Sequence, residues 1–171
     1  IHPDPATIRD WSQEWQFLVS SYGQSDRTYI YTVNRTDVAT GGSLTLRTQA
    51  EVDAFAASRI NVVEGNLTIG VEGGEAIVNL DGLAGLVSVR CDLTVTNAYR
   101  GEDLAGLAGL RRCESLRIGS AGAPHETLKR IELPALREVA GDLQLCGAAV
   151  RAVAFAALQR VDGDFAVGSD A

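Results

Sequence analysis

Two aspartates, Asp142 and Asp164, hold equivalent positions in consecutive copies of a repeated segment. If the copies stack, their carboxylates lie within about 5–6 Å of each other, the separation that retaining glycosidases use. A short polar side chain beside a tight bend explains the same column without any chemistry, because the other copies hold Ser43, Asn66, Asp92 and Ser115 there. We therefore predict no catalytic residues and no enzyme activity, with a carbohydrate-active enzyme using Asp142 and Asp164 as the alternative.

The sequence contains few of the residues that usually bind metals or cofactors. The chain has only two histidines, at positions 2 and 125, and no segment resembles a calcium-binding loop. Cys113 replaces an apolar residue of the other copies, which predicts a small buried hydrophobe. Cys146 is expected to point out of its strand, and a disulfide between Cys91 and Cys113 stays open. No metal site and no cofactor is predicted.

The composition argues against two classes of partner. Among the 171 residues, 22 acidic and 15 basic side chains give a net charge of −7. This balance disfavours non-specific binding to nucleic acid, which needs lysine and arginine to neutralise phosphates. No apolar run reaches the ~18–20 residues of a membrane-spanning helix. We expect a chain of domain size with its own core, no nucleic-acid partner and no membrane span.

A repeated pattern of apolar, polar and apolar residues sets the expected fold. Strict alternation of this kind is typical of a strand with one face turned inward. The six copies are Leu44-Thr45-Leu46, Leu67-Thr68-Ile69, Leu93-Thr94-Val95, Leu116-Arg117-Ile118, Leu143-Gln144-Leu145 and Phe165-Ala166-Val167. One copy cannot bury its own apolar side, but stacked copies can. The pattern predicts a mainly β solenoid of about six coils over residues 37–171, with its strands in a parallel sheet.

The stacking makes two further predictions about single positions. Leu93, Leu116 and Leu143 should be buried in successive coils, because each begins a repeated unit. Gly141 and Gly163 lie two residues before their units. They should either adopt backbone angles that other residues avoid, or sit where the neighbouring coil leaves no room for a Cβ.

Residues 1–36 lie outside the repeat and are expected to cap it. A spacing of 3, 4, 3 and 1 places five apolar residues on one helical face: Ile8, Trp11, Trp15, Leu18 and Val19. This segment predicts an N-terminal α-helix whose two tryptophans cover the first coil near Leu44, Leu46 and Phe55. A strand should follow, in which Tyr29, Tyr31 and Val33 alternate.

The predicted binding residues lie in the two longer copies and on the outer strand face. The insertion after the third strand unit carries Tyr99 and Arg100, expected as an exposed anchor, and the loop after the fourth carries His125. Insertions in repeat proteins often gather on the binding face, although drift in a tolerant loop explains the same lengths. Arg117 and Gln144 interrupt a column of threonines on the outward side of the strands.

Residues 63–69 (VEGNLTI) and 132–145 (ELPALREVAGDLQL) resemble the repeat consensus of the receptor L-domain family. This family includes the ligand-binding L domains of insulin- and EGF-type receptors and related modules of bacterial and fungal surface proteins. The resemblance covers roughly residues 37–171. It implies a right-handed β-solenoid related to leucine-rich repeats, exported from the cell and used for recognition. The Cys-rich module and the cysteine pattern of the receptors are missing, so no ligand residue carries over.

These observations lead to two classes of function. The first is a non-enzymatic recognition or adhesion module, extracellular, at the cell surface or in the periplasm, with a protein or glycan ligand. The second is a structural or self-assembling spacer, because no cap is visible after the last strand unit. An open sheet edge tends to pair with another chain, which predicts an end-to-end or homo-oligomeric contact through the C-terminal coil.

Overall fold

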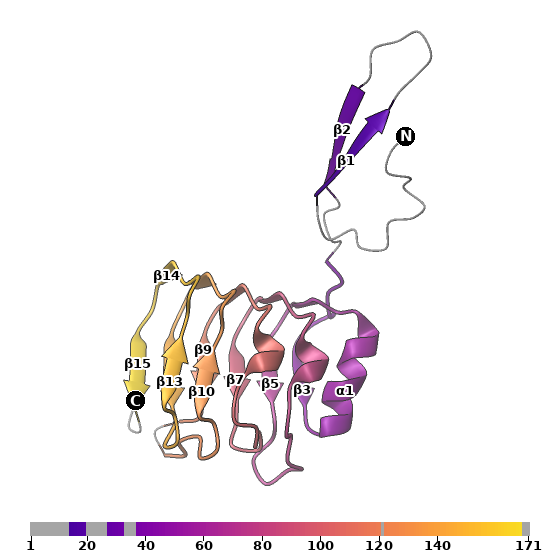
Figure 1. Ribbon diagram of the computed structural model, residues 1–171. Helices are drawn as coiled ribbons and strands as arrows, with labels where there is room; N and C mark the ends of the chain where they lie inside the picture. Colours follow the sequence, from indigo (N-terminus) through magenta and orange to yellow (C-terminus); the bar gives the residue numbers. More distant parts are fainter. Residues whose placement is uncertain (1–13, 20–26, 33–36, 121, 169–171) are drawn as a thin grey trace. The chain divides into compact units, whose positions relative to one another are not determined.

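The fold is described from a computed structural model, for residues 14–19, 27–32, 37–120 and 122–168. The chain divides into two compact units, Ile1–Thr36 and Asp37–Ala171, which are drawn in Figure 1. None of the helices within the described ranges is long and apolar enough to cross a membrane.

The first unit contains an antiparallel pair of strands where a helix was expected. Strand β1 (Glu14–Val19) pairs with β2 (Arg27–Thr32), with Trp15 opposite Tyr31. The prediction of an N-terminal helical cap is therefore wrong for residues 14–19, and the prediction of a strand around Tyr31 is confirmed. Both segments are rich in aromatic and β-branched residues, which favour cross-strand pairing. Ile8 and Trp11 lie outside the described residues.

The second unit is mainly β and is built on parallel sheets. Its largest sheet has the order β15-β12-β9-β7-β5-β3. The six strands are β3 (Leu44–Leu46), β5 (Leu67–Ile69), β7 (Leu93–Val95), β9 (Leu116–Ile118), β12 (Leu143–Cys146) and β15 (Phe165–Gly168). Every repeated unit of the sequence is thus a strand. The first residues of neighbouring units pair with each other, as in Leu93 with Leu116, so the register follows the repeat.

A second parallel sheet is present, and strands of the two sheets alternate along the chain. Its order is β14-β11-β8-β6-β4, with β4 (Val62–Val63), β6 (Ser88–Val89), β8 (Arg112–Cys113), β11 (Glu138–Val139) and β14 (Arg160–Val161). Strands β10 (Arg130–Glu132) and β13 (Ala152–Ala154) form a short parallel pair. The helical segments are α1 (Gln49–Ser58) and the 3-10 turns η2 (Asp81–Leu83) and η3 (Ala105–Leu107). We call one strand of each sheet with its connections a layer.

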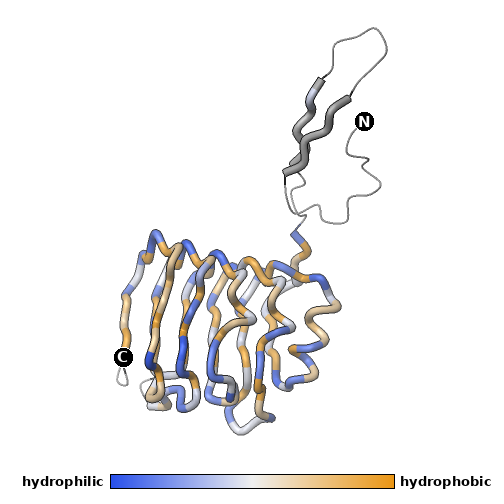
Figure 2. Tube along the Cα trace, viewed as in Figure 1, coloured by the Kyte–Doolittle hydropathy of each residue, from blue (hydrophilic) through white to orange (hydrophobic). Residues whose placement is uncertain are grey.

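The core lies between the sheets and is filled by the inward positions of each layer. Leu93, Leu116 and Leu143 are fully buried, which confirms the predicted inward face. Apolar and polar stretches alternate along the trace of the layers (Figure 2). Removing apolar surface from water contributes roughly 25 cal/mol per Å², so the repeated leucines are the main source of stability.

The layers pack so closely that two glycines have no space for a side chain. A Cβ at Gly141 would lie 2.8 Å from Ser115 Oγ in the preceding layer. At Gly163 it would collide with the Asp142 carboxylate. Neither glycine has a positive φ, so the requirement comes from the close approach of the neighbouring layer, one of the two reasons predicted.

Candidate functional site

Two adjoining hollows lie where the chain leaves the carboxyl ends of β5, β7 and β9. Their volumes are about 370 Å³ and 170 Å³, and both are lined by Glu72 and Asn97. Arg100 and Glu126 line the larger hollow, while Ser120 lines the smaller one. We call these five residues and the two hollows the loop-edge site. Loops of three consecutive layers therefore build one concave surface, which is mainly polar in the larger hollow and mainly apolar in the smaller one.

Two glycines turn the chain sharply into this site. Gly70 follows β5 with a φ of 83°, and Gly119 follows β9 with a φ of 65°. Left-handed angles of this kind are costly for residues that have a Cβ. A Cβ at Gly70 would also lie 2.6 Å from Thr96 Oγ1, and one at Gly119 would strike the backbone of Cys146. Glycine at both positions therefore sets the direction in which the loops depart.

The exposed groups of the site are held by surface interactions. Arg100 Nη1 lies 3.4 Å from Glu126 Oε2, and both side chains are exposed. Asn97 Nδ2 donates a hydrogen bond to the Ala123 carbonyl at 3.0 Å. Asn97 Oδ1 is buried and has no hydrogen-bond partner among the described residues. Exposed ion pairs contribute at most about 1 kcal/mol to stability. Breaking the pair therefore costs little, and Arg100 and Glu126 can each bind a ligand group instead.

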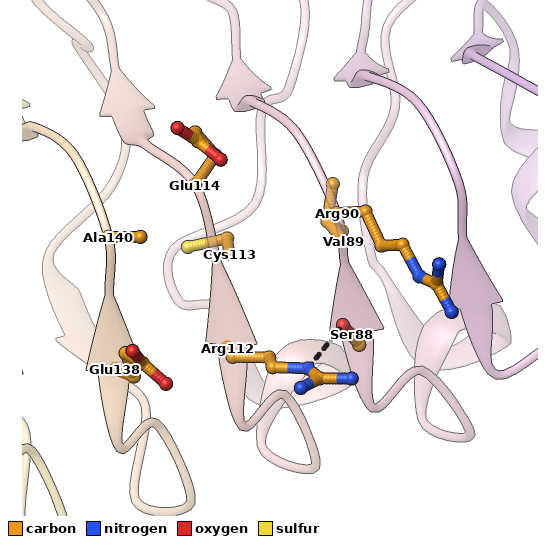
Figure 3. A pocket seen from close by; sticks show the side chains of 8 residues that line it. All are labelled: Ser88, Val89, Arg90, Arg112, Cys113, Glu114, Glu138 and Ala140. Atoms are coloured by element: carbon orange, nitrogen blue, oxygen red, sulfur yellow. Dashed lines mark hydrogen bonds between the residues drawn. The ribbon is translucent and has the colours of Figure 1, made fainter.

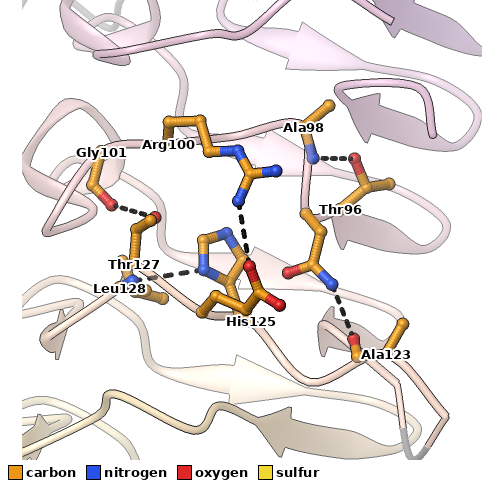
Figure 4. A network of polar contacts seen from close by, with 10 residues as sticks. Thr96, Ala98, Arg100, Gly101, Ala123, His125, Thr127 and Leu128 are labelled. Carbon is orange, nitrogen blue, oxygen red and sulfur yellow. Dashed lines mark hydrogen bonds and ion pairs between the residues drawn. The ribbon is translucent and has the colours of Figure 1, made fainter. Parts of the chain in front are cut away.

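His125, predicted as a binding residue, is a structural support of the site. Its side chain is completely buried, and Nδ1 accepts a hydrogen bond from the Leu128 N–H at 3.3 Å (Figure 4). Its backbone N–H donates to the Cys146 carbonyl at 2.7 Å. Burial, together with the charge of Arg100, lowers the pKa of His125 to about 4. The imidazole is therefore neutral near pH 7 and holds its own loop together, while the backbone of His125 joins that loop to the next layer.

Tyr99 corrects the expectation of an exposed aromatic anchor. Its side chain is only 2% exposed, and its hydroxyl donates to the backbone carbonyl of Asp103. The ring lies 5.9 Å from that of His125, and burial raises the pKa of the phenol. The insertion folds back and uses the ring as core, since a large apolar ring gains most by leaving water. Its neighbour Arg100 is exposed.

Arg117 and Gln144 lie side by side at another place, on the outer face of the large sheet. They are paired in register on β9 and β12, and Thr94 flanks Arg117 on β7. Arg117 is exposed and Gln144 is half-buried. Neither residue lines the loop-edge site. Of the predicted binding residues, the structure thus places Arg100 in the site, Tyr99 and His125 beneath it, and two on the sheet.

Asp142 and Asp164 form part of a structural ladder. Asp142 Oδ1 accepts the backbone N–H of Asp164 at 3.0 Å. Asn66 Oδ1 accepts the N–H of Asp92 at 3.1 Å in the same way, and Ser43 Oγ accepts the N–H of Asn66 at 3.0 Å. The short polar side chains of this column therefore bind the backbone of the following layer, which supports the structural interpretation over the catalytic one.

A third hollow, of about 420 Å³, lies over the five-stranded sheet (Figure 3). Arg112 Nε donates to Ser88 Oγ there at 3.1 Å, and Glu138 is the register neighbour of Arg112 on β11. Burial, with the charge of Asp92 as a second cause, raises the pKa of the Cys113 thiol to about 12, so Cys113 is not a nucleophile near neutral pH. Oppositely charged side chains of neighbouring strands, Arg112 and Glu138, thus line this third hollow. The sequence analysis did not identify it, although charged residues of opposite sign recur at this position of the repeat.

The remaining cysteines and acidic groups supply no metal centre. Within the described ranges, no group of three or more metal-ligating side chains is close enough to hold an ion. Cys91 and Cys113 are not joined by a disulfide. Cys146 is buried, contrary to the prediction that it points outward, because the loop that carries His125 lies across it.

Comparisons with known proteins do not assign a function to the chain. No family model, curated protein or solved structure matches the chain. The loop-edge site is concave and exposed, and loops of three consecutive layers build it. It is therefore the candidate binding site of this chain.

Proposed function

We propose that this chain is a non-enzymatic recognition or adhesion module that works outside the cell, at its surface or in the periplasm. Its ligand is a protein or a glycan, bound at the loop-edge site. The observation that carries the proposal is the pair of adjoining hollows, the larger one mainly polar and the smaller one mainly apolar, formed by three consecutive loops. In repeat proteins, loops of successive repeats on one face commonly form the binding surface.

The fold that we propose for this module is a right-handed β-solenoid of the receptor L-domain type. Support comes from the parallel strands paired in register with the repeat and from the polar ladder that links one layer to the next. Each layer buries its leucines only against neighbouring layers, which is the physical logic of a solenoid.

The chemistry of the hollows suits a ligand rich in hydrogen-bonding groups. Glu72 and Glu126 offer acceptors, and Arg100 offers donors. Ligand pockets commonly enclose about 300–1,000 Å³, so the larger hollow accommodates one sugar ring or one to two peptide side chains. With Tyr99 buried, binding here relies on polar contacts more than on stacking.

The test begins with purified protein screened against cell-wall glycans and surface proteins. Arg100→Ala should weaken binding of any ligand found by about tenfold or more, since a hydrogen bond to a charged group contributes roughly 1.5–3 kcal/mol. Arg90→Ala is the matched control, because Arg90 is also an exposed arginine in a surface ion pair, with Glu64 at 3.1 Å, but follows β6 and lines the third hollow instead of the loop-edge site.

Two outcomes would contradict the proposal. If no glycan or surface protein binds while a cytosolic partner binds tightly, the module does not act in recognition outside the cell. If binding survives Arg100→Ala but is lost in Arg117→Ala, the ligand occupies the outer face of the large sheet and not the loop-edge site.

A structural or self-assembling spacer is the second candidate function. The observation that favours it is the exposed apolar strand β15 at the end of the large sheet. A spacer would lengthen by repeated end-to-end contacts, whereas a recognition module needs no such contact. The mass of the protein at increasing concentration distinguishes the two.

A further inference from the structure

The third hollow arises from a change in one column of residues. The position directly after each strand of the five-stranded sheet holds, in successive layers, Glu64, Arg90, Glu114, Ala140 and Asp162. Ala140 is the uncharged member of this column, and it lines the hollow together with Arg90 and Glu114. The hollow therefore lies where one layer has a methyl group in place of a charged side chain.

The charges that line the hollow are balanced in number but not paired with each other. Two cations, Arg90 and Arg112, and two anions, Glu114 and Glu138, line it. Arg90 pairs with Glu64, which does not line the hollow, at 3.1 Å. Arg112, Glu114 and Glu138 form no ion pair with any side chain that the structure describes. One cation and two anions thus remain to pair with a ligand.

The guanidinium of Arg112 is held in place by a buried neighbour. Its Nε donates to Ser88 Oγ at 3.1 Å, and Ser88 is only 2% exposed. Figure 3 shows the guanidinium turned toward Ser88 and away from Glu138, although Arg112 and Glu138 are register neighbours. The two Nη atoms have no acceptor among the described residues. Two parallel N–H groups of an arginine match the two oxygens of a carboxylate.

Glu138 places a carboxylate on the next strand of the sheet, about 4.8 Å from the strand of Arg112. We propose that the third hollow binds a small zwitterion, a free α-amino acid. Its carboxylate is held by the Nη atoms of Arg112, and its ammonium group is held by the carboxylates of Glu138 and Glu114. Its side chain lies over Ala140.

The balance of charge favours a zwitterion over an ion of one sign. A simple anion at Arg112 would be repelled by Glu114 and Glu138, and a simple cation at these carboxylates would be repelled by Arg112. A neutral ligand with both charges matches a hollow whose lining has no net charge. The volume of about 420 Å³ lies within the range of small-molecule sites, and a free amino acid fits within it.

The experiment titrates the full chain with L-alanine near pH 7 and follows the backbone amide signals by nuclear magnetic resonance. Signals of residues 88–90 and 112–114 should shift and saturate. Acetate and methylammonium, which each carry one of the two charges, should bind at least tenfold more weakly. Arg112→Gln should also weaken L-alanine at least tenfold, because it removes the bidentate partner of the carboxylate. The matched control is Arg117→Gln, since Arg117 is exposed and lies outside the hollow.

A second variant tests the space without changing any charge. Ala140→Gln extends a neutral side chain into the hollow and should weaken L-alanine at least tenfold. It should keep the fold, judged by circular dichroism and the melting temperature, because Ala140 is exposed and neighbouring layers carry longer residues at this position. Ala57→Gln, at an exposed position of α1, is the control and should leave binding unchanged.

Four results would overturn the proposal. They are the absence of saturable shifts around the third hollow, equal affinity for acetate and L-alanine, equal affinities of Arg112→Gln and Arg117→Gln, and wild-type affinity in a folded Ala140→Gln. No residue lines both this hollow and the loop-edge site. Arg100→Ala should therefore leave L-alanine binding unchanged, so this proposal and the proposed function fail independently.

Discussion

The first and last layers of the second unit carry the same strand pattern but finish the sheet differently. At the first layer, Thr48 begins α1 by accepting the Glu51 N–H at 3.2 Å, and the Glu51 carboxylate in turn accepts the N–H of Arg47. Val52 and Phe55 of α1 are buried against the core. At the last layer, Phe165 and Val167 stay exposed.

The difference teaches that a parallel sheet needs two things at its end, an apolar cover and partners for the edge hydrogen bonds. Helix α1 supplies the cover and one such partner at the first layer, because Glu51, in a capping-box-like arrangement with Thr48, also accepts the Arg47 N–H just after β3. The last layer has neither within the described residues. Stability should therefore decrease from the inner layers to the last one.

The largest effect should come from an inner layer. Leu116→Ala removes a fully buried side chain and should lower the free energy of unfolding by about 2–5 kcal/mol. Val167→Ala at the open end should lower it by less than about 1 kcal/mol, because its side chain is already half exposed. Denaturant titration of both variants checks this. Equal losses would show that the last layer is as well packed as the inner ones.

Acid should destabilise the layers around β9 and β12. His125 has a folded-state pKa of about 4 against an ordinary value of 6.5. Its neutral form is therefore favoured by folding, and the stability is complete above pH 6.5 and lost as the pH falls toward 4. The loss should be on the order of 3 kcal/mol. Urea titration over this range measures it.

The control for the pH effect is His125→Gln, which does not titrate. Its stability should depend less on pH between 6.5 and 4 than that of the wild type, although its absolute stability is lower. Protection of the Leu128 amide, which donates to the imidazole, measured relative to the intrinsic exchange rate at each pH, should decrease in acid, whereas protection of the Glu51 amide in the first layer should not. Parallel pH curves for the two proteins would contradict the role of His125.

A smaller effect is expected at the closed end. Glu51→Ala removes the acceptor of the Arg47 N–H and should cost about 1 kcal/mol, as lost helix caps do. Glu75→Ala removes an exposed carboxylate elsewhere and is the control. An unchanged melting temperature would show that the Glu51 carboxylate does not stabilise this end of the sheet.

The smallest effect concerns the polar ladder. Asp142→Asn keeps an oxygen that accepts the Asp164 N–H and should change the free energy of unfolding by less than about 0.5 kcal/mol. Asp142→Ala removes the acceptor and should cost about 1 kcal/mol. Thermal denaturation of the pair distinguishes them. A large loss in Asp142→Asn would mean that the negative charge itself matters.

Much of the second unit could be predicted from the sequence, because its strands are defined by local alternation. The repeated units are strands in the expected register, and Leu116 lies in the core as expected. For Gly141 the sequence left two reasons open, costly backbone angles or a close approach of layers, and the structure shows the second. Each of these depends on residues that recur at a fixed offset. Their surroundings are therefore the same from layer to layer.

Only the tertiary structure determined those elements and buried side chains that depend on contact with one particular distant segment of the chain. Residues 14–19 allow either a helical or a strand periodicity, and pairing with β2 selects the strand. Tyr99 and His125 are buried because their loops fold back on each other, and loop length alone does not encode that closure. Sequence by itself determined the repeat and its inward face, since side-chain alternation is local. Contacts between distant residues determined which loop side chains remain free to bind.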